Sequence, residues 1–195
     1  MVDARNVAVG KPKIGGAIFR APIGTALPTD EKTQLDAAFK DCGYVSDSGW
    51  EQAIKKSYGS VKAWGGDEVA KPRSELTVSA SLELIEAHNP EALAAVYASA
   101  ELTITEATET SGRKTALAYK GEDADPAIWV IDMKFGNKLR RFVFGNAVNA
   151  TEDFTRTFSD EDPIGLPIDL ALLPDTDGVY FYEYADDGVF AAEAA

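Results

Sequence analysis

The sequence has one cysteine, one histidine and no apolar run near the roughly 20 residues that a membrane span needs. Because Cys42 is alone, an intramolecular disulfide is excluded, and the chain suits a reducing compartment or is indifferent to redox conditions. The first residues lack the charged-then-apolar pattern of a signal peptide, which argues against secretion by that route. We therefore expect neither a membrane partner nor a disulfide framework.

Signatures of catalysis and metal binding are also missing. Cys42 has no sequence signature of an activated nucleophile, and no Gly-x-Ser-x-Gly elbow occurs. His88 stands just before an expected helix cap, where a structural hydrogen bond explains it, and one histidine without a cysteine cluster makes no usual transition-metal site. The acids at 160–162 and at Asp175 and Asp177 lack EF-hand spacing, so solvated turns explain them. We expect no enzyme, no cofactor and no metal.

Basic residues are nearly absent from the last quarter of the chain. Residues 145–195 contain Arg156 and 12 acidic side chains, so this segment carries −11 of the net charge of −13. An acidic surface repels phosphate groups and argues against tight binding of DNA or RNA. A solvated face that keeps the protein soluble explains the same charge equally well.

The clearest local pattern is a strand followed by a helix. Residues 75–84 alternate strictly, which predicts a strand with one buried face. The apolar members of this alternation are Leu76, Val78, Ala80, Leu82 and Leu84. A helix over about 88–98 follows, because Asn89 is a good N-cap, Pro90 suits the first helical position and Glu91 favours the positive end of the helix dipole.

The strongest hairpin prediction lies at residues 128–135 and 138–144, which flank the two-residue turn Gly136-Asn137. Apolar residues on both faces indicate a strand pair that is covered on both sides. Cross-strand aromatic and opposite-charge pairs favour one register. That register pairs Trp129 with Phe144, Val130 with Val143, Ile131 with Phe142 and Asp132 with Arg141.

Several other segments give weaker predictions. The glycine- and proline-rich residues 1–25 indicate an irregular arm, and residues 32–39 show a weak helical period. Residues 164–172 alternate as a strand, but Pro167 within it indicates an edge or a bulge. The end of the chain, 185–195, has little to bury and is expected to be a loose tail.

Residues 47–66 combine four glycines with large apolar side chains and show no closed pattern. Such a segment is unusual for a mere connector. Two interpretations stay open: a long hairpin whose tip packs elsewhere, for example in stacking, or a loop that lies on its own core. Its large apolar side chains are Trp50, Ile54, Tyr58, Val61 and Trp64.

Taken together, a series of short motifs resembles the major tail proteins, or tail tube proteins, of long-tailed, non-contractile phages. The resemblance covers most of residues 5–184, whereas residues 47–58 and 106–125 depart from it. Its most recognisable segment is Lys-Ala-Trp-Gly-Gly-Asp at 62–67. The other motifs lie at 9–18, 24–30, 35–40, 43–46, 84–87, 129–132 and 173–178.

The resemblance implies a mainly β, α+β fold: a single tail tube domain over 1–195, built as a β-sandwich with one flanking helix. In this family, subunits form hexameric rings that stack into a hollow tube for genome delivery, and the inner sheets of a ring join into a continuous barrel. The implied partners are further copies of the chain, a tape-measure protein and tail-end proteins, while DNA passes through without specific binding. The implied location is the virion tail, with assembly in the host cytoplasm.

We expect apolar and basic residues at the assembly contacts and acidic residues on the tube wall. Candidate assembly contacts are Trp50, Ile54, Tyr58, Lys138 and Arg140, the last two belonging to a basic hairpin tip with Lys134 and Arg141. Candidate acids that face the lumen or a neighbouring ring are Glu152, Asp153, Asp160, Glu161, Asp162 and Asp169.

Two other function classes compete with a structural subunit. One is a β-sandwich ligand- or carbohydrate-binding module of a phage fibre, with Trp50, Tyr58 and Trp64 as an exposed platform. The other is a small hydrolase that uses paired carboxylates, although no pair is singled out by the sequence.

Overall fold

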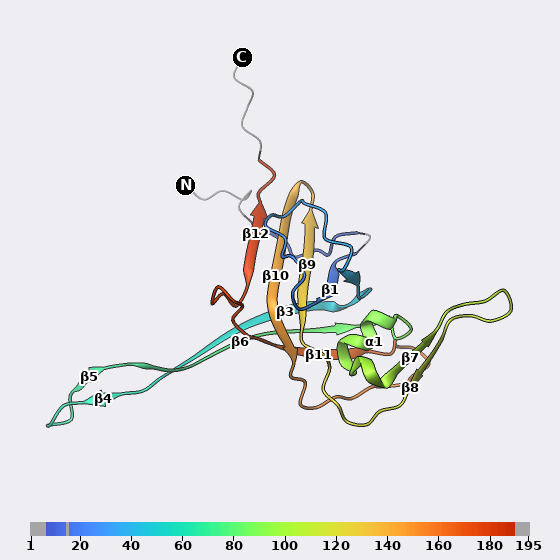
Figure 1. Ribbon diagram of the computed structural model, residues 1–195. Helices are drawn as coiled ribbons and strands as arrows, with labels where there is room; N and C mark the ends of the chain where they lie inside the picture. Colours follow the sequence, from blue (N-terminus) through green and yellow to red (C-terminus); the bar gives the residue numbers. More distant parts are fainter. Residues whose placement is uncertain (1–6, 15, 190–195) are drawn as a thin grey trace, which may run out of the picture.

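The computed structural model describes residues 7–14 and 16–189, and strands dominate this part of the chain (Figure 1). The described residues contain one α-helix, α1 (Pro90–Val96), followed by a single 3₁₀ turn, η2 (Ser99–Glu101). The strands are β1 (Ile18–Pro22), β2 (Lys40–Asp41), β3 (Val45–Tyr58), β4 (Val61–Lys62), β5 (Glu68–Ala70), β6 (Arg73–Leu84), β7 (Leu102–Thr105), β8 (Lys114–Leu117), β9 (Ala127–Phe135), β10 (Lys138–Asn149), β11 (Leu166–Leu172) and β12 (Tyr182–Asp186).

The main sheet is antiparallel and folds over on itself at β10. Its strand order is β2-β1-β9-β10-β11-β6-β3, and β12 pairs with β10 on the side away from β9. Between Phe144 and Ala147 the register shifts, and beyond this point β10 pairs with β11. A bulge of this kind bends a strand, so β10 belongs to two facing layers. The predicted mainly β, sandwich-like fold is confirmed.

The main core fills the space between the two layers. One layer contributes Ile18, Trp129, Ile131, Phe142 and Phe144. The other contributes Val78, Ala80, Leu82, Leu84, Leu166, Ile168 and Leu170. Burying one large apolar side chain stabilises a fold by about 1.5–3 kcal/mol, so this interface is the principal source of stability.

The β9–β10 hairpin has the predicted register, including the pairs Trp129 with Phe144 and Asp132 with Arg141. Gly136 has φ of +63°, which a two-residue hairpin turn requires at its first central position. A second, smaller cluster covers the outer face of this hairpin, where Phe39 packs with Val130 and Val143. The prediction that these strands are covered on both faces is therefore confirmed.

The helix begins as predicted. The side chain of Asn89 accepts a hydrogen bond from the backbone N–H of Glu91 at 3.0 Å, and Pro90 occupies the first turn. α1 buries Ala92, Leu93 and Ala95 and packs beside β11 and β7. The expected hydrogen bond of His88 is not found among the described residues, because its ring is exposed and Asn89 provides the cap instead.

The predicted helix at residues 32–39 is wrong. The carboxylate of Asp30 accepts hydrogen bonds from the backbone N–H groups of Lys32 and Thr33, and Asp36 caps Ala38 in the same way. Such side-chain bonds compete with helix formation. In addition, the Arg141 guanidinium binds the carbonyls of Asp30 and Thr33, and a helix over 32–39 would use the carbonyl of Thr33 internally.

Strand β11 contains Pro167 at a locally open edge, as the sequence predicts. The backbone N–H and C=O of Asp169 bond toward the β10 side, to Thr151 and Ala150. Because backbone orientation repeats every two residues, the nitrogen of Pro167 points to that same side, away from β6. At Pro167, β10 is no longer paired with β11, since the pairing of these two strands covers only residues 170–172 of β11. No ladder hydrogen bond is lost.

Two arms extend from opposite sides of the body in Figure 1. The long arm is formed by the outer parts of β3 and β6 and continues into β4 and β5. The short arm is the β7–β8 hairpin, whose base is held by the buried carboxylate of Glu101. This carboxylate accepts hydrogen bonds from the backbone N–H groups of Lys120 and Glu122.

The predicted N-terminal arm (1–25) and C-terminal tail (185–195) lie partly outside the described residues. Within the described part, residues 18–22 form β1 and pair with β9, and the backbone of Lys11 and Lys13 bonds to the same strand. In the part of the chain that the structure describes, no helix has the length and apolar character needed to cross a bilayer.

Candidate functional site

The long arm carries several exposed apolar side chains. Ile54 and Tyr58 on β3 are 51% and 58% exposed, and Trp64 at the tip is fully exposed. Ten residues separate Ile54 from Trp64, which corresponds to about 30 Å of extended strand at roughly 3.3 Å per residue. Ile54 lies opposite the core residue Val78 and is half covered, whereas Tyr58 and Trp64 lie further along the arm and are available to another molecule.

The tip of the long arm is a closed turn. The backbone N–H of Ala63 bonds to Asp67, and that of Gly66 bonds back to Ala63, at 2.8 and 3.0 Å. Gly65 and Gly66 have φ of +113° and +99°, a region that side chains other than glycine rarely adopt. The Lys-Ala-Trp-Gly-Gly-Asp motif is therefore a hairpin end that presents Trp64 to solvent.

Trp50 lies on the same face of β3 as Ile54 and Tyr58, but it points into the core. Its ring packs edge-on against Phe142 and Phe144, with ring centroids 4.8 and 6.0 Å away. The structure thus separates Trp50 from the other candidate contacts of this strand. It also means that Trp50, Tyr58 and Trp64 do not form one exposed aromatic platform.

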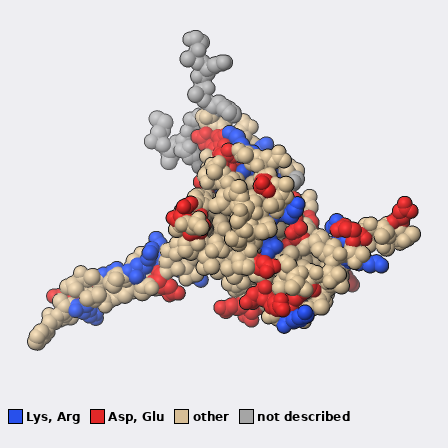
Figure 2. All heavy atoms as spheres, in the orientation of Figure 1, with Lys and Arg blue, Asp and Glu red and all other residues tan. Residues whose placement is uncertain are grey.

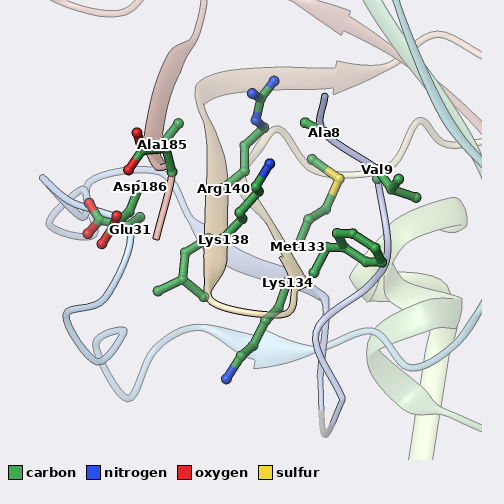
Figure 3. A pocket seen from close by; sticks show the side chains of 13 residues that line it. Ala8, Val9, Glu31, Met133, Lys134, Lys138, Arg140, Ala185 and Asp186 are labelled. Atoms are coloured by element: carbon green, nitrogen blue, oxygen red, sulfur yellow. The ribbon is translucent and has the colours of Figure 1, made fainter. Parts of the chain in front are cut away.

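The tip of the β9–β10 hairpin carries the basic candidates and borders a cavity of about 590 Å³ (Figure 3). Arg140 forms an ion pair with Glu183 of β12 at 2.9 Å and keeps 42% of its side chain exposed. The ammonium group of Lys138 donates to the carbonyl of Val7 at 2.8 Å. We refer below to this space as the hairpin cavity; its charged lining residues are Glu31, Lys134, Lys138, Arg140, Asp186 and Asp187.

Arg141, which the sequence groups with that basic tip, belongs to the interior. It is 1% exposed and binds Asp132 through two hydrogen bonds of 2.6 and 2.9 Å. This pairing raises the pKa of the Arg141 guanidinium. Arg141 therefore fixes the fold and is not available to a partner.

The acidic candidates are all exposed. Five of them lie on the loop between β10 and β11, and Asp169 lies on the exposed side of β11. Within residues 7–14 and 16–189, none of the six forms an ion pair with a Lys or Arg side chain. Acidic side chains gather at the base of the body in Figure 2, below the region of α1. This surface has an unbalanced negative charge.

The acidic loop contains a cluster of Arg156 with aromatic rings that the sequence patterns did not predict. The Arg156 guanidinium lies over the rings of Tyr97, Phe154 and Phe158, at 5.6, 5.9 and 5.6 Å from their centroids. Cation–π contacts of this kind hold the loop against the end of α1. The signal available in the sequence was a single arginine with an aromatic residue two positions away on each side.

Comparison with known families decides what kind of protein carries these surfaces. A family model described as "Phage tail tube protein" matches residues 8–195. The chain belongs to the phage tail tube protein family. The resemblance inferred from the short motifs is thereby confirmed, and the match includes the segments that carried no recognisable motif. A search of curated proteins finds no match.

As a member of the tail tube family, the chain has a structural role in the phage virion tail, where it associates with itself in a tube.

Two groups of kinds that are reactive in other proteins have structural surroundings here. Cys42 is buried in the main core, and burial raises the pKa of its thiol. Asp175 organises the turn before β12 by accepting hydrogen bonds from Asp177, Val179 and the Tyr182 hydroxyl. The last of these raises the pKa of Tyr182 to about 12.

The main sheet has open strand edges that suit self-association in a tail tube protein. Within the part of the chain that the structure describes, β3, 14 residues long, ends the main sheet and pairs with β6 alone, and β12 pairs with β10 alone. Long unpaired edges invite pairing with other chains. In a protein that associates with itself, such an edge is a natural place for a neighbouring subunit.

Proposed function

We propose that this tail tube protein assembles into hexameric rings, that the rings stack into a hollow tube, and that this tube is the conduit for genome delivery. The observation that carries the proposal is the long arm, which leaves Ile54 half exposed at its base and takes Tyr58 and Trp64 beyond the reach of their own core. Large exposed apolar groups on a stable protrusion mark an interaction site. Together with the family membership, they support assembly as the purpose of the arm.

Edge-to-edge pairing supports the ring. Closing a sheet through neighbouring subunits removes its exposed edges, and among the described residues β2, β3 and β12 each have an outer edge without a partner strand in the main sheet. We infer that the sheets of adjacent subunits join through such edges into one continuous barrel. The number six comes from the resemblance to tail proteins of long-tailed phages.

The acidic residues support a wall that does not hold DNA. A phosphate backbone passes most freely along a surface that repels it and offers few Lys or Arg side chains. We propose that some of the exposed acids face the lumen and that others pair with Lys138 and Arg140 of a neighbouring subunit or ring. The acids concerned are Glu152, Asp153, Asp160, Glu161, Asp162 and Asp169.

Further partners follow from the same role. A tube of defined length and with two different ends is expected to contact a tape-measure protein and tail-end proteins, and its subunits are expected to assemble in the host cytoplasm. These partners would meet the surfaces that ring stacking leaves free.

Electron microscopy of the concentrated full-length protein, alone and with a tape-measure partner, tests the proposal. We expect rings or tubes with a central channel. Light scattering on the same samples gives the mass of the assemblies. A strictly monomeric species under all of these conditions would contradict the proposed function.

A further inference from the structure

We propose that Trp64, at the tip of the long arm of one copy, docks into an aromatic cavity on the body of a second copy. The cavity lies between α1, β8 and the acidic loop that links β10 to β11, and we call it the α1 cavity. The inference rests on the proposed self-assembly and names the contact through which the arm acts.

Trp64 has the properties of an interface anchor. It is fully exposed, and the closed glycine turn behind it fixes the backbone that presents it. Tryptophan is enriched among the few residues that carry most of the binding energy of an interface, and such residues fill pockets on the partner. An anchor of this type requires a concave, aromatic acceptor.

The α1 cavity offers that acceptor. Its volume is about 530 Å³, within the usual range of binding pockets. The ring of Tyr97 meets those of Tyr119 and Phe154 edge-on, with centroids 6.0 and 5.8 Å apart. Tyr119 and Phe158 are each 68% exposed although they border a cavity. Aromatic rings prefer such edge-on neighbours, so an indole can join this cluster.

Charge distinguishes this cavity from the hairpin cavity. Residues 52–76 contain five basic and three acidic side chains; the excess lies at Lys55 and Lys56 at the base of the arm, because residues 57–75 hold three of each. The α1 cavity is lined by Glu122 and Asp123 against Arg156, and the loop in its wall carries five further acids. The hairpin cavity is lined by three acids and three bases. The lysines of the arm, including Lys62 beside the tip, therefore find more counter-charge at the α1 cavity.

The directions of the two surfaces agree with head-to-tail contact. In Figure 1 the arm tip and the α1–β8 side lie on opposite sides of the molecule. A contact between two different surfaces of one chain is heterologous, and its repetition gives a closed ring or a helical stack. Tip-to-cavity docking thus propagates from copy to copy, as a tube requires.

Disulfide trapping in the full-length protein tests the proposal. The chain's own Cys42 is completely buried, so introduced thiols react without interference. The test variant combines Ala63→Cys with Leu117→Cys, two exposed positions beside Trp64 and in the cavity lining, so that the indole and the aromatic rings are kept. The matched control combines Ala63→Cys with Phe135→Cys, because Phe135 lines the hairpin cavity and is 42% exposed. All substituted positions are exposed, so the fold should persist, and thermal unfolding checks this.

Under assembling conditions and mild oxidation, we expect the Ala63→Cys/Leu117→Cys variant to form a ladder of disulfide-linked oligomers on a non-reducing gel. The control variant should stay largely monomeric on the same gel. A ladder in the control alone, or tubes without a ladder in either variant, would overturn the docking site and leave the tube role intact. Absence of any assembly in the unmodified protein would overturn both proposals.

Charge exchange provides an independent readout. Lys62→Glu with Lys71→Glu on the arm should raise the concentration needed for assembly about tenfold, because the arm then repels the acidic wall of the cavity. Adding Glu122→Lys and Asp123→Lys should recover most of that loss. Failure of the second pair to restore assembly would count against docking in the α1 cavity.

Discussion

The guanidinium of Arg141 donates two hydrogen bonds to the carboxylate of Asp132, at 2.6 and 2.9 Å, and both side chains are buried. The same guanidinium donates to the carbonyls of Asp30 and Thr33, at 3.0 and 2.9 Å. One ion pair therefore joins the central hairpin to the segment that covers its outer face. Because a buried charge must be compensated, this pair makes the position of that segment part of the fold.

Replacing Asp132 with Ala should lower the free energy of unfolding by about 3–5 kcal/mol, since Arg141 would remain buried without its counter-charge. Urea denaturation followed by tryptophan fluorescence measures the change. The matched control is Arg140→Ala, which removes the exposed pair with Glu183 and should cost only about 0.2–1 kcal/mol. Equal losses in the two variants would refute the role of the buried pair.

Asp30 makes stability depend on pH in the acid range. Hydrogen bonds from the side chain and backbone of Thr33, and then from the backbone of Lys32, lower the pKa of Asp30 from 3.8 to about 2. A depressed pKa in the folded state contributes stability above the unfolded value, and this contribution is lost as the pH falls toward the folded value. Between about pH 4 and pH 2, Asp30→Ala should therefore lose less stability than the unmodified protein. If the unfolding free energies of Asp30→Ala and of the unmodified protein change equally with pH in this range, the prediction is contradicted.

Truncating the long arm separates folding from assembly. Trp50 and the inner part of β3 belong to the core, so the deletion must begin beyond Ile54. Replacing residues 57–75 with Asn-Gly joins the directly paired Lys56 and Leu76 through a turn that favours hairpins. We expect cooperative unfolding to persist and ring or tube formation to stop. Loss of cooperative unfolding would mean that the arm is part of the core.

The basic hairpin tip should make assembly sensitive to salt. Exchanging Lys138 and Arg140 for Glu should impair polymerisation while the monomer stays folded. Each exposed pair is worth only about 0.2–1 kcal/mol, but a ring repeats it in every subunit. Sedimentation at increasing ionic strength measures the effect, because salt screens exposed charges. Normal tubes with unchanged salt dependence would show that the tip has no such role.

Arg156 should control the order of the acidic loop. Changing it to Ala removes cation–π contacts with three rings, each worth about 0.5–1 kcal/mol at an exposed site. We expect faster amide hydrogen exchange in residues 152–162 and little change in β9. Arg156→Lys keeps the charge without the planar stacking group. Its exchange rate in residues 152–162 should therefore lie between those of the unmodified protein and Arg156→Ala. Unchanged exchange in Arg156→Ala would show that the loop is held in another way.

The sequence by itself determined the elements whose signals are local. The Asp132–Arg141 pairing followed from a two-residue turn and a period of two, because these fix the register of a hairpin. Asn89 and Pro90 determined where the helix begins, because caps act within one turn. The short motifs likewise led to the tail tube family, although not to the surfaces that would carry assembly.

The tertiary structure decided which of the candidate contacts are covered. Trp50, Ile54 and Tyr58 share one face of β3, yet Trp50 packs against Phe142 while the other two are exposed. Alternation says which side of a strand is apolar, but not where the opposite layer ends. In the same way, the helix expected at 32–39 is prevented by local bonds to the carboxylates of Asp30 and Asp36. It is also prevented by Arg141, which binds the carbonyl of Thr33 from a strand more than a hundred residues away. Contacts of that range depend on the whole fold, and no local pattern contains them.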